Sequence, residues 1–195
     1  MNGDGLHPAW LNLAWLRAEW PAAVTAFAVT SGRLLLALAL GFGLGAGLAA
    51  LMRRSPRSEA ALTPWLLGLL AVPWALILVT LNLIPTLGVR DGTAVTVAAL
   101  AAAVQIFALG RRKLEEKREA YLQRALTYAF TAIVASELLA RSDGLGGKIR
   151  FYALFTQYPQ LLLYLALALL LWGLFTLAGR ALKKGLGRTF LGRSA

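Results

Sequence analysis

The stretch TSGRLLLALALGFGLGAGLAALM, residues 30–52, decides the class of protein to which this chain belongs. After Arg33 it reaches Met52 without another charged side chain. At about 1.5 Å per residue, a helix of this length crosses the roughly 30 Å of hydrocarbon in a bilayer. The whole chain agrees, because its mean hydropathy is +0.65 and only 15% of its residues are charged, against about 25% in soluble domains. The sequence therefore predicts an integral membrane protein.

The predicted fold is all-α, a polytopic bundle of about five spanning helices. The expected spans are residues 23–52, 62–83, 93–109, 125–140 and 160–182. Before them, Trp10, Trp15 and Trp20 are typical of a segment that lies at the headgroup level. The chain thus divides into an interfacial segment (1–22), a transmembrane domain (23–182) and a basic cytoplasmic tail (183–195).

Positive charge gathers in alternate connections, which predicts the orientation of the chain. Residues 53–59, residues 111–124 and the tail are rich in Lys and Arg, whereas the connections between them are poorer. The positive-inside rule then places the N-terminus outside and the C-terminus in the cytoplasm. Topology accounts for most of the net charge of +11, so we expect lipid contact and no nucleic-acid partner.

Glycines interlock in the first span. Gly41 and Gly45 are four residues apart, as are Gly43 and Gly47. Such pairs allow close approach of another helix, either within the same chain or from a second copy.

Proline divides the second expected span. Pro73 is expected to kink or break that helix. The break is compatible with a simple bend, or with a broken helix that lines a transport pathway.

Two charged residues are expected at similar depth below the outer surface. Arg33 lies in the outer half of the first span and Glu137 near the outer end of the fourth. A charge at this depth is costly unless it is paired or faces water. We predict an ion pair that fixes helix packing, or two groups that share a polar pathway for an anionic or zwitterionic solute. The glycines that follow, Gly144 and Gly146, predict a helix end and an outer turn.

The cytoplasmic connection at 111–124 alternates in charge. A short helix there would place opposite charges three or four residues apart. This helix is either a solvated extension of a neighbouring span or a docking helix for a cytoplasmic partner. The candidate docking residues are Arg111, Arg112, Glu115, Glu116, Arg118 and Glu119.

Catalytic and metal-binding chemistry is not expected. The chain has no Cys, one His, and nine acidic residues that are spread along the sequence. We therefore predict no enzyme activity, no cofactor and no metal site.

The order of these motifs resembles the inner-membrane permeases of bacterial ABC importers that work with a binding protein. The similarity is to the branch that serves sulfonates, taurine, nitrate and thiamine precursors. It covers roughly residues 26–182 in two blocks. The matching positions are Ser31, Gly32 and Arg33, the glycines after them, Pro64 and Pro73, and then Glu137, Gly144, Leu145 and Gly146.

The chain departs from that family in two places. The family has a Glu-Ala-Ala coupling loop for its ATPase, but here Glu119 and Ala120 are followed by Tyr121, with no later Gly or Leu-Pro. The usual first helix is also replaced by the Trp-rich segment.

The resemblance implies a transmembrane importer subunit for a small, possibly anionic solute. It would pair with a second permease-like chain, a cytoplasmic ATPase and an outer solute-binding protein in the bacterial inner membrane. The departures leave an alternative, an accessory or structural membrane subunit that derives from a permease.

Overall fold

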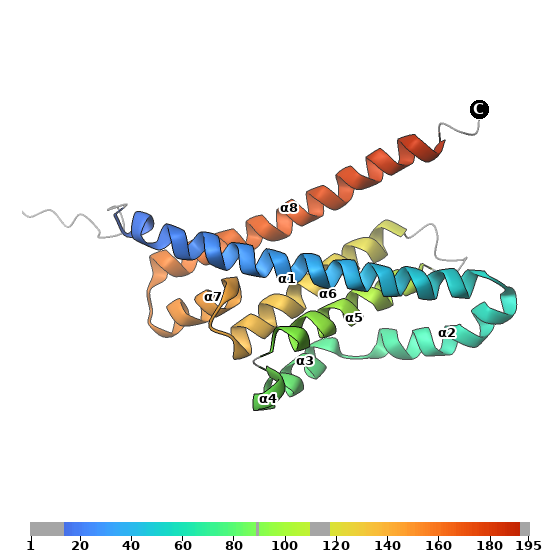
Figure 1. Cartoon of the computed structure of the whole chain (residues 1–195), viewed down its shortest axis with the longest axis horizontal. Helices are drawn as coiled ribbons and strands as arrows, with labels where there is room; N and C mark the ends of the chain where they lie inside the picture. Colours follow the sequence, from blue (N-terminus) through green and yellow to red (C-terminus); the bar gives the residue numbers. More distant parts are fainter. Residues whose placement is uncertain (1–13, 89, 110–117, 192–195) are drawn as a thin grey trace, which may run out of the picture.

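The structure is a computed structural model that describes residues 14–88, 90–109 and 118–191. Every regular element in these ranges is an α-helix, which confirms the expected all-α class. The helices run lengthwise in a bundle, with the short α7 across one end and the C-terminal part of α8 projecting from the other (Figure 1). Their bounds are α1 Ala14–Arg53, α2 Pro56–Ala71, α3 Trp74–Asn82, α4 Pro85–Gly88, α5 Asp91–Ala108, α6 Arg118–Ala140, α7 Gly144–Leu154 and α8 Tyr158–Leu191.

Three of the described helices are long and apolar enough to cross a membrane: α1, α5 and α8 over Tyr158–Gly179. A fourth span results if α2 and α3 count as one broken span, since they bend by 64°. The expected number of about five is therefore not confirmed. The fourth expected span lies in α6, whose polar and charged side chains lower its hydropathy.

The Trp-rich segment and the first span are joined where the structure describes them. The α1 helix contains Pro21 and continues from Ala14 to Arg53. Its 40 residues extend about 60 Å, twice the thickness of the hydrocarbon. Residues 1–13 lie outside the described part of the chain. At the other end of the chain, α8 extends through the expected basic tail as far as Leu191.

The core of the bundle is the α5 helix. It packs most extensively on α1 and then on α6. Most of its side chains from Ala94 to Ala108 are buried, and many of them are alanine. Small side chains allow neighbouring backbones to approach closely, which compensates for the lack of a hydrophobic driving force between helices in lipid.

One glycine pair of α1 makes the α1–α5 contact. A Cβ at Gly41 would lie 2.7 Å from the Ala99 carbonyl oxygen, and one at Gly45 would lie 2.6 Å from that of Ala103. Gly43 and Gly47 point away, because a Cβ at either would meet no described atom within 4 Å. The two pairs therefore occupy different surroundings.

Replacing Gly45 by Ala should destabilise the protein, because the new methyl group overlaps backbone that has no room to move. Overpacking of this kind costs about 1–3 kcal/mol. The matched control is Gly47→Ala, which should be neutral or stabilising by about 0.5–1 kcal/mol because Ala favours a helix. Thermal unfolding of the purified variants in detergent compares them. Equal unfolding temperatures would contradict the α1–α5 packing described above.

Candidate functional site

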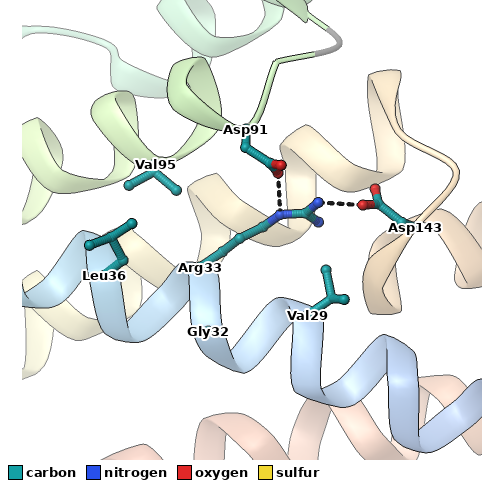
Figure 2. A pocket seen from close by; sticks show the side chains of 7 residues that line it. All are labelled: Val29, Gly32, Arg33, Leu36, Asp91, Val95 and Asp143. Atoms are coloured by element: carbon teal, nitrogen blue, oxygen red, sulfur yellow. Dashed lines mark hydrogen bonds and ion pairs between the residues drawn. The ribbon is translucent and has the colours of Figure 1, made fainter.

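A charged cluster lies where α1, α5, α6 and α7 meet. Arg33 comes from α1, and Asp91 is the first residue of α5. Glu137 lies in the last turn of α6, and Asp143 is the N-cap of α7. Figure 2 shows the Arg33 guanidinium extending from α1 between Asp91 and Asp143. Four segments that are distant in sequence thus contribute to one site.

Each nitrogen of the Arg33 guanidinium donates to a different carboxylate. Nε donates to Asp91 Oδ1 at 2.7 Å, and Nη1 donates to Glu137 Oε1 at 2.8 Å. Nη2 donates to Asp143 Oδ2. The side chain is 7% exposed, so these pairs offset the cost of burying its charge.

Glu137 is fully buried and caps the N-terminus of α7. Its Oε2 accepts a hydrogen bond from the backbone N–H of Gly146 at 3.0 Å. The Thr30 hydroxyl donates to the same carboxylate and accepts from the N–H of Leu145 at 2.8 Å. The first N–H groups of a helix lack partners within the helix, and its dipole favours negative charge there. The carboxylate therefore fixes α7 onto α1 and α6.

Glycine is required at the turn that leads into this contact. Gly144 has φ +77°, a conformation that L side chains rarely adopt. A Cβ there would lie 2.3 Å from the Glu137 carboxylate carbon, and a Cβ at Gly146 would lie 2.4 Å from the Val134 carbonyl oxygen. The glycines of the expected outer turn thus lie directly against the buried carboxylate.

Arg141 extends the network on its exposed side. It donates to Asp91 Oδ1 at 2.9 Å and to Asp143 Oδ1 at 3.0 Å. Burial alone would raise the pKa of Asp143, but hydrogen bonds and charge from Arg141 and Arg33 lower it below its usual 3.8. Arg150 of α7 donates to the carbonyl oxygens of Leu139 and Arg141, which adds a tie between α6 and α7.

A second polar contact lies between α1, α7 and α8. The hydroxyls of Tyr152 and Tyr164 both donate to Glu19 Oε1 at 2.6 Å, and their rings stack with centroids 5.5 Å apart. Burial raises the pKa of Tyr152, and the hydrogen bond and charge of Glu19 raise it further. The first turns of α1 are therefore tied to the α7–α8 hairpin.

An open hollow borders the charged cluster. Its volume is about 400 Å³. Arg33, Asp91 and Asp143 form its polar side (Figure 2). Its other lining residues in the described part of the chain are Val29, Gly32, Leu36 and Val95.

The structure brings together Arg33, Glu137, Gly144 and Gly146, which the sequence had singled out. Sequence reasoning missed Thr30, Asp91, Arg141 and Asp143. A signal existed for Thr30, because it lies three residues before Arg33 and so shares a helix face with it.

The other candidates lie elsewhere. Pro73 is the N-cap of α3, at the break between α2 and α3. Near this broken pair, the Ser136 hydroxyl of α6 lies 3.4 Å from Asn82 Oδ1. Of the candidate docking residues, Arg118 and Glu119 open α6. The other four fall outside the described residues.

Within residues 14–88, 90–109 and 118–191 there is no group of three His, Cys, Asp or Glu side chains able to hold a metal ion. No protein family model, no curated protein and no solved structure matches the chain.

Glu137→Ala should strongly destabilise the protein, because it leaves Arg33 short of a partner and the Gly146 N–H uncapped. Removing one member of a buried ion pair costs about 3–5 kcal/mol. Glu137→Gln keeps an acceptor for the α7 N-terminus and should cost less. Unfolding of the two variants in detergent provides the measurement. If Glu137→Ala lowered the stability no more than Glu137→Gln, the capping role would be contradicted.

Low pH should remove the contribution of Asp143 to the stability of the folded protein. Because its folded pKa is lowered from 3.8, its stabilising effect is present above that value and is lost as pH falls through the lower folded value. The stability difference between wild type and Asp143→Asn should therefore be full at about pH 6 and shrink as the pH falls below about 4. Unfolding temperatures of both proteins across this range test the expectation. A difference that does not change with pH would refute it.

Proposed function

We propose that the chain is a transmembrane subunit of an ABC-type importer-like complex that moves a small solute. One observation carries the proposal. Residues 31–33 and 137–146 belong to the two sequence blocks that resemble the permease family. They are far apart in the chain, yet they meet in one structural unit. Arg33 of the first block pairs with Glu137 of the second, which in turn holds Gly146.

Two further features support transport. The hollow beside Arg33 is open and combines charged with apolar lining, as small-molecule sites do. The α2–α3 pair is broken at Pro73 and bent by 64°. Broken helices at membrane depth are tolerated where they are buried in protein or line a cavity.

Pairing with a second permease-like chain is part of the proposal. The side of α1 that faces away from the bundle carries Gly43 and Gly47, where a Cβ would meet no described atom within 4 Å. Large exposed side chains lie along the same helix, including Leu44, Leu48 and Leu51. Lipid and a partner helix would both suit this surface.

A second candidate is an accessory or structural membrane subunit, with no transport of its own. It is favoured by the complete burial of Glu137, whose carboxylate is engaged by Thr30, Arg33 and Gly146. Such a carboxylate fixes helices and is not available to a solute. The short connection between α5 and α6 also favours this reading, because the family couples to its ATPase through a longer loop.

The proposed setting is the bacterial inner membrane, with the N-terminus outside and the C-terminus in the cytoplasm. Under this orientation the α7 end of the bundle faces outward. The α1–α2 connection then faces the cytoplasm, where Arg54 and Arg57 are exposed, as the positive-inside rule requires.

Affinity purification of the tagged full chain from its native membrane in mild detergent tests the proposal. A nucleotide-binding subunit should co-purify in stoichiometric amount, together with an outer solute-binding protein. Neutral substitutions at Arg111, Arg112, Glu115 and Glu116 should reduce recovery of the ATPase by about tenfold or more, the equivalent of about 1.4 kcal/mol. The matched control is Arg54→Gln with Arg57→Gln, which lowers basic charge at the neighbouring connection. Recovery of unrelated membrane subunits without any nucleotide-binding protein would refute the importer and favour the accessory subunit.

A further inference from the structure

The hollow between α1, α5 and the α6–α7 turn has a polar side and an apolar side. Arg33, Asp91 and Asp143 supply the charge, and Val29, Leu36 and Val95 supply the apolar surface (Figure 2). Its volume is about 400 Å³, and it is shallow and open to the surface, so a ligand there would remain partly exposed. Gly32 leaves it open, since a Cβ there would meet nothing within 4 Å.

Arg33 is poorly placed to receive an anion, although it is the only cation among the described residues that line the hollow. Each of its three nitrogens already faces a carboxylate, at 2.7 Å for Nε and 2.8 Å for Nη1. A sulfonate or carboxylate ligand would have to displace one of these charge-assisted hydrogen bonds, which are the strong class. It would also approach two lining carboxylates of its own sign.

Asp91 is placed to receive a cation. Its side chain is 64% exposed. Its ion pairs with Arg33 and Arg141 both end on Oδ1, so Oδ2 keeps its acceptor capacity. Asp143 is 48% exposed and lies on the opposite side of Arg33. The hollow therefore offers acceptors beside an apolar wall.

We propose that this hollow binds the ammonium group of a small organic cation. The ammonium group lies against Asp91 Oδ2, and a short apolar chain lies against Val29, Leu36 and Val95. If this ligand is the transported solute, the inference rests on the proposed function, and it replaces the anionic solute that the permease resemblance implies with a cationic one. Binding itself requires no ATPase, so it can be tested separately.

Two probes of equal chain length and opposite charge, n-butylammonium and n-butanesulfonate, test the sign of the ligand. Isothermal titration calorimetry on the full chain, in nanodiscs of phosphatidylglycerol, should show saturable butylammonium binding at least about tenfold tighter than butanesulfonate binding. Asp91→Asn should weaken butylammonium binding by about tenfold or more. Gly32→Leu should abolish it by filling the hollow. Gly173→Leu is the matched control and should leave it unchanged, because that position is equally open but lies on α8.

Equal or tighter binding of butanesulfonate would overturn the proposal, as would affinities unchanged by both Asp91→Asn and Gly32→Leu. Nanodiscs that also contain phosphatidylethanolamine identify the source of the ammonium group. Weaker butylammonium binding there assigns the site to a lipid headgroup, and unchanged binding assigns it to a free solute. A chain that co-purifies with an ATPase but binds no butylammonium would refute the cation site alone.

Discussion

The buried contact between Arg33 and Glu137 is the constraint on which the arrangement of the helices depends. Charges in the apolar part of a helix bundle are costly, and both groups are almost completely removed from solvent. Their burial is tolerable because Arg33 has three carboxylates and Glu137 has the Thr30 hydroxyl and the Gly146 N–H. Moving α7 away would leave two N–H groups of the helix without acceptors and the buried Glu137 carboxylate without one of its donors. The position of α7 is therefore coupled to that of α1 and α6.

The glycine contacts between α1 and α5 and the Arg33–Asp91 ion pair occur at one and the same alignment of the two helices. In the α1–α5 interface, Gly41 lies against Ala99 and Gly45 against Ala103, so the two helices are parallel. Arg33 precedes Gly41 by eight residues (41 minus 33), and Asp91 precedes Ala99 by the same number (99 minus 91). The ion pair between Arg33 and Asp91 thus follows from the close approach of the helices. A side chain at either glycine would disturb both.

The sequence was sufficient for features that depend on local pattern. Apolar runs predicted the all-α class, and helical rise placed Arg33 and Glu137 at a common depth. The partners that complete the network could not be found in this way, because Asp91 and Asp143 lie at helix starts whose position depends on tertiary packing. The interfacial segment was expected to be separate because its tryptophans favour the headgroup level. The described part of it continues into α1 instead, and its Glu19 contacts with Tyr152 and Tyr164 could not be read from the sequence.

Under the proposed transport function, the network limits where movement can occur. The ion pairs and the α7 cap join α1, α5, α6 and α7 into one unit at the end that contains the hollow. Opening a pathway within that unit would separate buried charges, each at a cost of several kcal/mol. Among the described residues, no such ion pair or cap holds the break at Pro73 or the side of α1 that faces away from the bundle around Gly43 and Gly47. Alternating access would then involve bending between α2 and α3, or sliding of this unit against a second chain, with the charged cluster moving as a rigid body.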